Sequence, residues 1–594
     1  MSLAIPLCFV PFIVLCTCHN LTVYNTSLDD SGKMELLWQV DYEASTVIFQ
    51  LRADTDANGF AFGMSDDGTL RKADLVVFWT EGNSVNVADS WTDDHGYFHV
   101  DKSQDYHLID YTANAGKTSV TFSRRFDTCD QQDYRIDSGT TNLLYVLPEH
   151  DISAVSDLNN DDARMRFGTK RQQLLKTDTD TPPLPPDVRS FDIRVNQAKI
   201  PPEETTYWCR TQPLPTLPAK VHVLQYEPII APGNEAVVHH MTVFLCGNDV
   251  SSTAGYDGPC EGEEDRRELK TCKHVIAAWA MGAQAFAYPE EAGIPLGGPS
   301  ASTFAMIEIH YNNPGRRKDI VDSSGVRFHY TPTLRRHDAG IMELGLRYLP
   351  SMAIPPRQDS YVITGFCPAQ CTVKGLPAGG IQVFASQLHT HLAGTAVWTK
   401  HVRSGVELPE LNRDNHYSTM FEVKRLFREN EGERGERKKG EKGKEKDRGR
   451  YDHYDEGTQG DVLMTSCKYN TADRRSVTLG GYGIHDEMCL NYIHYYPASP
   501  LQACKSVVAA SALDRFFDVV FSLFGTPNEQ NVADDFSHMP WNPLTTAYLT
   551  SLYRRGPIDV MCQKTTGEIF EGKWTDLEQP HIRKPQNPQR KCQA

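Results

Sequence analysis

Two histidines separated by one residue stand near the end of an apolar stretch in the C-terminal half of the chain. The stretch Ile381–Gly394 (IQVFASQLHTHLAG) has the two-residue alternation that predicts a β-strand, and this alternation puts His389 and His391 on one largely apolar face. Burying imidazole nitrogens without partners is costly, and neutral imidazole is the commonest metal ligand. The pair therefore indicates either a metal site or two hydrogen-bonded strand histidines.

Three further stretches carry side chains that can bind metals. His239 and His240 are adjacent in Ala236–Cys246, a second apolar strand, so both can reach one metal only at a bulge or strand end, or through different ring nitrogens. A third apolar strand presents His310, and Met488 offers a thioether beside a cysteine. Each of these residues alone is also compatible with ordinary core packing.

Length and composition indicate a multidomain globular protein of the secretory pathway. The chain has 594 residues, 40% hydrophobic residues and a formal net charge of −17, which disfavours general nucleic-acid binding. The apolar segment 1–18 predicts a signal peptide, or less readily an uncleaved anchor, and Asn20 and Asn25 follow in glycosylation acceptor patterns. No later run of about 18 apolar residues predicts a membrane span. We expect a secreted or lumenal protein.

The cysteine count agrees with an oxidising compartment. Three of the 15 cysteines lie in the signal segment, and the remaining twelve predict six disulfides with no spare thiol. Cys367 and Cys371 could form half of a zinc site, but no second cysteine pair at metal spacing accompanies them. Disulfide-linked oligomers are therefore not expected, whereas other oligomers stay open.

Residues 35–150 form one β-rich block. Short β-prone runs separated by Gly, Asp and Asn predict an antiparallel β-sandwich. The block resembles the DOMON module through Gly59-Phe60, Gly63-Met64-Ser65, Ala73-Asp74 and Phe122-Ser123-Arg124. A structural or interaction role and a role in ligand or metal binding both stay open, although no histidine or methionine pair suggests a cofactor.

Two more β-rich blocks follow, at 190–330 and 335–505, with strand-length apolar runs and little helical periodicity, so the predicted fold class is all-β. The mixed-charge segment 428–450 predicts a solvated insert in the second of these blocks. The tail 506–594 is expected to hold a small helix at Ala509–Leu523 and to be irregular afterwards.

Taken together, these stretches resemble the copper type II, ascorbate-dependent monooxygenases, most closely the dopamine β-hydroxylase-like group. The resemblance covers nearly the whole chain. The motifs that carry it are ETTYWC (204–209), VHHM (238–241), AAWAMGAQAFAYPEEAG (277–293), EIHYNNP (308–314), HDAGIMELGL (337–346), FASQLHTHLAG (384–394), DNHYS (414–418) and DEMCLNYIHYYP (486–497).

The resemblance implies a DOMON β-sandwich followed by two jelly-roll-like β-sandwich subdomains, which hold one copper each across an open cleft. Of the family's functional residues, Tyr207 and His389 would be catalytic, although Tyr207 can equally be a strand-edge aromatic residue. The copper ligands it implies are His239, His240 and His310 for the first ion, and His389, His391 and Met488 for the second. A soft thioether favours Cu(I), which suits the site that meets O₂.

The resemblance also implies a pairing of all twelve cysteines. The pairs are Cys209–Cys260, Cys246–Cys272, Cys367–Cys504, Cys371–Cys562, Cys467–Cys489 and Cys129–Cys592.

The leading hypothesis is therefore an enzyme that hydroxylates a C–H bond of a small, phenylethylamine-like substrate with O₂, two coppers and ascorbate as electron donor. Peptide α-amidation is a weaker alternative, because amidating relatives carry an arginine two residues before the His-x-His motif and this chain has Gln387 there. A non-catalytic copper-binding or adhesion protein is the alternative of a different class.

Overall fold

The structure of the chain is a computed structural model that describes most residues between 22 and 586. The predicted signal segment 1–18, Asn20 and the insert 428–450 lie outside the described residues. The chain divides near residues 178 and 179 into two compact units, each considered by itself below. The described ranges are 22–29, 31–55, 57–82, 84–114, 116–158, 164–175, 183–247, 255–260, 269, 271–281, 283–299, 301–419, 425–426, 455–525 and 531–586.

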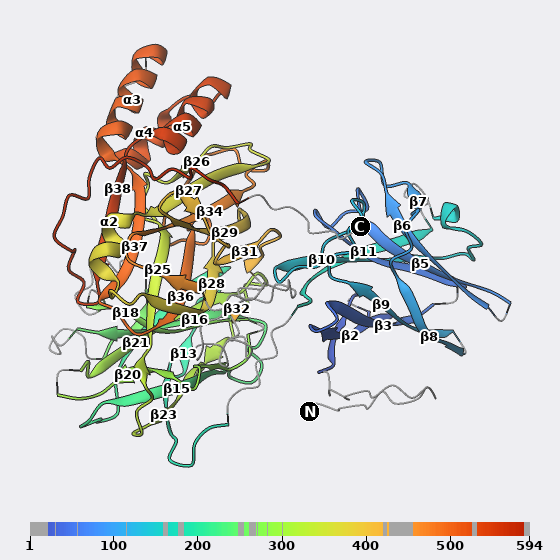
Figure 1. Ribbon diagram of the computed structural model, residues 1–594, viewed down its shortest axis with the longest axis horizontal. Helices are drawn as coiled ribbons and strands as arrows, with labels where there is room; N and C mark the ends of the chain where they lie inside the picture. Colours follow the sequence, from blue (N-terminus) through green and yellow to red (C-terminus); the bar gives the residue numbers. More distant parts are fainter. Residues whose placement is uncertain are drawn as a thin grey trace, which may run out of the picture. The chain divides into compact units, whose positions relative to one another are not determined.

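The first unit is the β-sandwich that the sequence predicts, built from two antiparallel sheets (Figure 1). Their strand orders are β1-β2-β3-β9-β8 and β11-β10-β4-β5-β6-β7. The bounds are β1 Tyr24–Ser27, β2 Met34–Asp41, β3 Thr46–Asp54, β4 Gly59–Ser65, β5 Asp74–Glu81, β6 Ser84–Thr92, β7 Phe98–Val100, β8 His107–Asn114, β9 Lys117–Arg125, β10 Thr140–Pro148 and β11 Met165–Gln173, with a short 3₁₀ helix at Val155–Asp157.

Side chains from both sheets meet in one apolar core. In β2 every second side chain is buried, as expected for a strand with one face against a core. The ring of Phe122 packs 5.3 Å from that of Phe49 and 5.1 Å from that of Phe78, measured between centroids. A Cβ at Gly63 would lie 2.0 Å from the carbonyl oxygen of Asp74, so this position of the DOMON pattern accepts only glycine.

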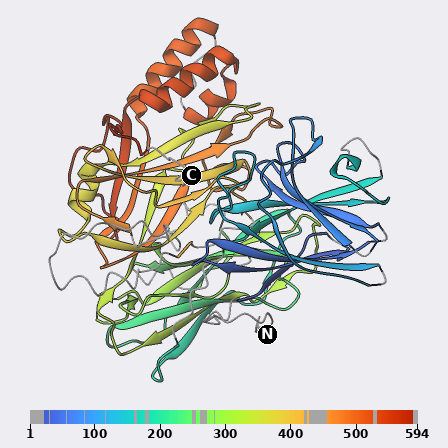
Figure 2. The ribbon, with the colours of Figure 1, turned by 45° about the vertical axis from the view of Figure 1, so that its right-hand side comes forward.

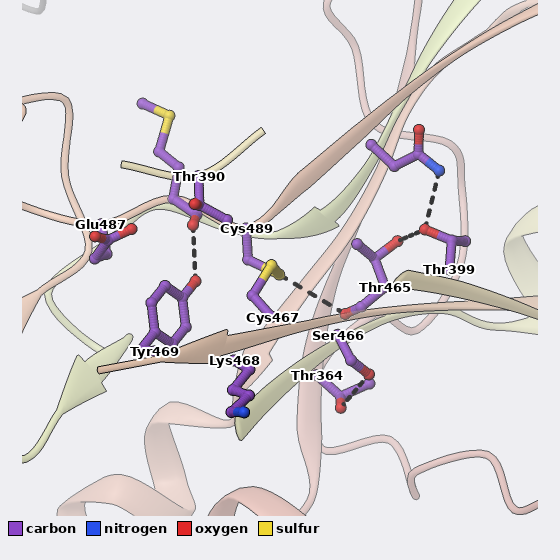
Figure 3. Close-up of a disulfide and its surroundings, with 12 residues drawn as sticks. Thr364, Thr390, Thr399, Thr465, Ser466, Cys467, Lys468, Tyr469, Glu487 and Cys489 are labelled. Atoms are coloured by element: carbon purple, nitrogen blue, oxygen red, sulfur yellow. Dashed lines mark hydrogen bonds between the residues drawn. A yellow bond between two sulfur atoms is a disulfide. The ribbon is translucent and has the colours of Figure 1, made fainter. Parts of the chain in front are cut away.

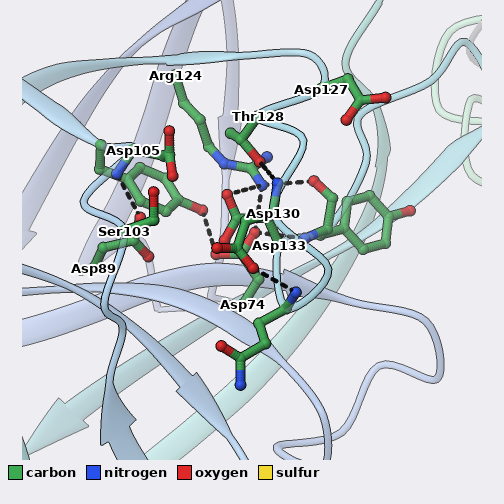
Figure 4. A network of polar contacts seen from close by, with 12 residues as sticks. Asp74, Asp89, Ser103, Asp105, Arg124, Asp127, Thr128, Asp130 and Asp133 are labelled. Carbon is green, nitrogen blue, oxygen red and sulfur yellow. Dashed lines mark hydrogen bonds and ion pairs between the residues drawn. The ribbon is translucent and has the colours of Figure 1, made fainter. Parts of the chain in front are cut away.

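A network of acidic side chains is buried in the same unit (Figure 4). The fully buried Arg124 lies with Nη2 2.6 Å from Asp74 Oδ2 and 3.4 Å from Asp133 Oδ2. Asp89 is 1% exposed, and its Oδ2 accepts the backbone N–H of Asp105 at 2.8 Å. Its Oδ1 has no hydrogen-bond partner among the described residues. A single guanidinium therefore serves several buried carboxyl groups.

The second unit begins with a subdomain of two facing sheets. One has the order β17-β14-β21-β16-β18, and the other has the order β12-β23-β15-β20-β24 with β19 also on β15. The bounds are β12 Arg189–Arg194, β13 Ala198–Lys199, β14 Thr205–Pro213, β15 Val221–Ile229, β16 Val238–Cys246, β17 Asp257–Pro259, β18 Cys272–Ala280, β19 Phe286–Ala287, β20 Ala292–Leu296, β21 Phe304–Asn312, β22 Val321–Asp322, β23 Gly325–Thr331 and β24 His337–Asp338.

A second sandwich follows in the same unit, with orders β32-β28-β36-β25-β37-β38 (β33 also on β28) and β27-β34-β29-β30 (β31 also on β29). The fold is thus all-β, as predicted. The bounds are β25 Gly340–Leu346, β26 Ala353–Ile354, β27 Tyr361–Cys367, α2 Ala369–Gly375, β28 Ile381–His389, β29 Gly394–Arg403, β30 Val406–Glu407, β31 Asn412–Asp414, β32 Arg425–Leu426, β33 Asp455–Gly457, β34 Asp461–Tyr469, β35 Thr478–Leu479, β36 Leu490–Tyr496, β37 Leu501–Val508 and β38 Ile558–Lys564.

The C-terminal region is more ordered than the sequence suggests. The predicted helix is confirmed as α3 (Ala510–Phe524), but the chain does not become irregular directly after it. Two more helices follow, α4 (Val532–His538) and α5 (Pro543–Arg555), and both views show the three helices together at one end of this unit (Figures 1 and 2). The side chain of Asn542 caps α5, and Pro543 occupies its first turn. Strand β38 then pairs with β37, which extends the sheet.

The disulfide pattern agrees with the pairing that the family resemblance implies. Within the described residues the structure contains Cys209–Cys260, Cys246–Cys272, Cys367–Cys504, Cys371–Cys562 and Cys467–Cys489. The sixth predicted pair involves Cys592, which lies outside them. Asn25 is exposed on β1, in keeping with its predicted glycosylation. No helix in the described part of the chain has the length and hydropathy needed to span a membrane.

The buried acidic network makes the stability of the first unit depend on pH. Burial, with the neighbouring carboxylate of Asp74, raises the pKa of Asp89 to about 8. An aspartate in the unfolded chain has a pKa of about 4. Between this pKa and that of the folded protein, folding takes up a proton, so the free energy of unfolding falls as the pH rises. We expect Asp89→Asn to raise the melting temperature at pH 8 by at least about 3 °C, and by less near pH 4.

Differential scanning calorimetry of the full chain across this pH range measures the effect. Asp110→Asn, which removes an exposed carboxyl group from β8, is the control and should change little. A melting temperature for Asp89→Asn at pH 8 that is no higher than that of the unaltered protein would contradict the prediction.

Candidate metal centres

Three neighbouring strands in the first subdomain of the second unit present side chains in one row across the sheet. In the antiparallel register, Tyr207 of β14 lies opposite His310 of β21, and His310 lies opposite His240 of β16. Residues that pair in this way point to the same face of a sheet. The register therefore collects two imidazoles and a phenol from three separate stretches of sequence.

His239, the remaining histidine, lies at a β-bulge in β16. The register between β16 and β21 shifts between Val238 and His240, so His239 is the extra residue. A bulge redirects a side chain that would otherwise point to the opposite face. The structure thus contains the bulge that the sequence analysis gives as one way for two adjacent histidines to reach one metal.

The three imidazoles converge on one another. The Nδ1 atom of His240 lies 3.3 Å from the Nδ1 atoms of both His239 and His310. Ring nitrogens of all three residues fall within 4.8 Å of one another. His310 is only 2% exposed, and its Nε2 has no hydrogen-bond partner among the described residues.

Burial also keeps two of these rings, those of His240 and His310, neutral. Desolvation, followed by the neighbouring imidazoles, holds the pKa values of His240 and His310 well below the usual range for histidine. A neutral imidazole keeps a lone pair for a metal, and three of them form a donor set that suits copper. The residues present therefore fit a copper ion.

Tyr207 packs directly on this group. Its ring stacks on that of His310 with centroids 4.6 Å apart and planes 7° apart, and lies 6.0 Å from the ring of His240. The structure therefore brings the predicted catalytic tyrosine into contact with a predicted ligand, not merely to a strand edge.

The second histidine pair lies at a strand end. The predicted strand is present as β28, but it ends at His389, so the expectation that the strand continues through His391 is wrong. Its alternation is also interrupted by a register shift between Val383 and Ala385. The two imidazole rings nevertheless stay close, with centroids 5.3 Å apart.

The turn after β28 requires its small residue. A Cβ at Gly394 would lie 1.8 Å from Oγ1 of Thr390, so the glycine of the LHTHLAG motif allows the chain to fold back at once. The hydroxyl of Tyr417 accepts the N–H of Thr390 at 3.0 Å and donates to its carbonyl at 3.1 Å. The peptide between the two histidines is thereby fixed.

Strand pairing brings Met488 to the same turn. In the register of β28 with β36, His389 lies opposite Leu490, so Met488 precedes β36 at the end where β28 stops. Met488 is 9% exposed, and the next residue, Cys489, forms a disulfide with Cys467. Two imidazoles and a thioether are a donor set that fits Cu(I).

The two candidate ligand sets are neighbours. The ring of His240 lies 6.0 Å from the ring of His389, in an edge-on arrangement. The apolar core of the first subdomain also includes Phe384 and Ala385 of β28. The expectation of an open cleft between the two sites is therefore wrong for this structure, because the subdomains meet at the site itself.

Comparison with known families agrees with this geometry. The copper type II ascorbate-dependent monooxygenase profiles match at residues 191–318 for the N-terminal domain and at 337–437 and 451–517 for the C-terminal domain. A DOMON domain profile matches residues 30–147. The chain belongs to the copper type II ascorbate-dependent monooxygenases. As a member of this family it is an enzyme that uses copper and ascorbate.

Full-length relatives extend the similarity. The chain is 42% identical over 564 residues to dopamine beta-hydroxylase of Rattus norvegicus, which covers 94% of this chain and 87% of the relative. It is 35% identical to tyramine beta-hydroxylase of Caenorhabditis briggsae, covering 92% and 90%. It is 30% identical to DBH-like monooxygenase protein 1 of Homo sapiens, covering 95% and 89%.

One buried side chain at the second site was not singled out from the sequence. Glu487 is 0% exposed and its carboxylate accepts backbone N–H groups of the His391 turn. Burial raises its pKa to about 7, although those N–H donors favour the carboxylate. The motif DEMCLNYIHYYP contains this residue, but its role depends on a contact between distant segments.

The first histidine group can be tested by copper binding. We expect His310→Ala to lose one copper per chain, because it removes an imidazole from a buried three-histidine set. Inductively coupled plasma mass spectrometry of the copper-loaded, dialysed protein measures the loss. His329→Ala, which removes a β23 histidine paired with Glu227, should keep full copper content. Unchanged copper in the His310 variant would contradict the assignment.

Proposed function

We propose that the enzyme hydroxylates a C–H bond of a small phenylethylamine-like substrate at a pair of copper sites. The proposed ligands are His239, His240 and His310 for one ion, and His389, His391 and Met488 for the other. The names of the dopamine and tyramine beta-hydroxylase relatives support the substrate class. One oxygen atom of O₂ enters the product, and the other leaves as water with two electrons from ascorbate and two protons.

The observation that carries the proposal is the adjacency of two chemically different ligand sets. Three imidazoles accommodate a copper that cycles between two oxidation states, whereas a thioether favours the reduced ion. The 6.0 Å separation of the His240 and His389 rings puts both sets beside one reaction space. Bound copper supplies the one-electron chemistry for O₂ activation, and ascorbate supplies the electrons.

The protein's own groups set the environment of the reaction. His240 and His310 are kept neutral by burial, so they bind a cation without first losing a proton. The stacked ring of Tyr207 fixes the orientation of His310, and its hydroxyl is the proposed auxiliary acid. His389, the other proposed catalytic residue, stands at the junction of the two sets.

Position 387 supports an amine over a peptide substrate. Gln387 is 4% exposed on β28, two residues before His389, and carries no positive charge for a peptide carboxylate. The five described disulfides and the predicted signal segment support action in the secretory pathway or outside the cell.

Oxygen uptake by copper-loaded protein tests the function. We expect about two coppers per chain and ascorbate-dependent O₂ consumption that requires a phenylethylamine such as tyramine. Hydroxylated product should form in a one-to-one ratio with O₂, as measured by mass spectrometry. Fully loaded protein that turns over a glycine-extended peptide but no amine would contradict the substrate class. Fully loaded protein inert with both would favour a binding role.

The thioether can be tested separately. We expect Met488→Ile to lower amine hydroxylation by at least about 100-fold, because isoleucine fills the space without offering sulfur. Met464→Ile on nearby β34 is the matched control and should retain activity within about threefold. Rates are followed with an oxygen electrode at saturating ascorbate. Full activity of the Met488→Ile variant would contradict the assignment of Met488 as a copper ligand.

A further inference from the structure

The second copper site has to be assembled from two distant segments. His389 is the last residue of β28 and His391 follows the strand, whereas Met488 precedes β36, whose first residue, Leu490, pairs with His389. Strand pairing therefore stops short of both His391 and Met488. Some other interaction has to hold these two residues together beyond the strand ends.

Glu487 provides that interaction. Its side chain is fully buried, and both carboxylate oxygens accept N–H groups from the segment that contains the histidines. Oε2 accepts the N–H of His391 at 2.9 Å, and Oε1 accepts the N–H of Ala393 at 2.6 Å. The carboxylate therefore spans two segments that are 96 residues apart in sequence.

Asp486, the residue before Glu487, orients the imidazole ring of His391. Nδ1 of His391 lies 3.1 Å from the carbonyl oxygen of Asp486. A carbonyl oxygen can only accept, so Nδ1 carries the proton and Nε2 keeps the lone pair. Such a contact fixes the ring orientation of a metal-binding histidine. Asp486 and Glu487 thus hold the ring and the backbone of the same residue.

Met488 is anchored from its other side as well. The fully buried Tyr469 donates its hydroxyl to the carbonyl oxygen of Met488 at 2.7 Å. Cys489 is linked to Cys467 on the same strand, β34, two residues before Tyr469. Figure 3 shows Glu487, Thr390, Tyr469 and this disulfide grouped around the turn. The backbone of Met488 is therefore restrained before, at and after the residue.

We propose that Glu487, supported by Tyr469, is a positioning residue that brings His391 and Met488 to one copper. The inference rests on the proposed function, because it requires these two residues to be ligands. Neither residue touches the reacting atoms in this account. They fix where the thioether and the second imidazole stand, and thereby the affinity and the sulfur coordination of one of the two coppers.

The test compares copper binding by Glu487→Gln and by the unaltered protein. Glutamine keeps one acceptor oxygen but turns an NH₂ group towards an N–H donor, which removes one of the two contacts. We expect the affinity for one copper to fall about 10- to 100-fold, measured by competition with a Cu(I) chelator. The copper–sulfur contribution to the Cu(I) X-ray absorption spectrum should also weaken, while the other copper stays bound.

Two further variants serve as a control and as a second test. Glu407→Gln makes the same change at a buried carboxylate of β30 that pairs with Lys400, so its copper affinity and sulfur signal should be unchanged. Tyr469→Phe keeps the buried ring and removes only the hydroxyl bonded to Met488, so it should lower the affinity for the same copper. If Glu487→Gln does not fold, Tyr469→Phe provides the test. A copper affinity and a sulfur signal equal to those of the unaltered protein would then overturn the inference.

The outcomes separate the inference from the proposed function. If Met488→Ile abolishes the sulfur signal but folded Glu487→Gln keeps both affinity and signal, the positioning role is wrong and the ligand assignment stands. If the unaltered protein binds fewer than two coppers, or if Met488→Ile keeps the signal, the proposed function itself is wrong.

Discussion

The site depends on strand register. His240, His310 and Tyr207 face one another because β14 pairs with β21 without a register shift and β16 pairs with β21 from His240 onward, directly after the bulge at His239. A shift of one residue would turn an imidazole to the other face of the sheet. Two disulfides, Cys209–Cys260 and Cys246–Cys272, tie strands of this sheet to one another. The same constraint applies where β28 meets β36, and there Cys467–Cys489 joins β34 to the segment that carries the thioether.

Burial determines what the grouped imidazoles can bind. Imidazoles packed this closely and excluded from water cannot all be protonated, so the site favours an external cation. The second set replaces one imidazole by a thioether, which favours a different oxidation state of the same metal. The rings of His240 and His389 lie 6.0 Å apart, so the two proposed ligand sets are neighbours.

Much of this organisation is readable from the sequence, because the signals are local. Alternation predicts β28, β-prone runs predict the strands of the first unit, and the adjacency of His239 and His240 indicates a bulge or strand end as one way for both to reach one metal. The family motifs supply the five disulfides that the structure describes. The short separation of the ligand sets and the role of Glu487 are not readable, because both come from contacts between segments distant in sequence. The end of β28 at His389 and the helices α4 and α5 were missed for a local reason, since short turns and caps give weak patterns.

The proposal that two coppers occupy adjacent sites with different ligands can be tested by anomalous diffraction at the copper edge, from crystals of copper-loaded and reduced protein. We expect two anomalous peaks per chain, one among His239, His240 and His310 and one among His389, His391 and Met488. A single peak, or a second peak away from Met488, would contradict it.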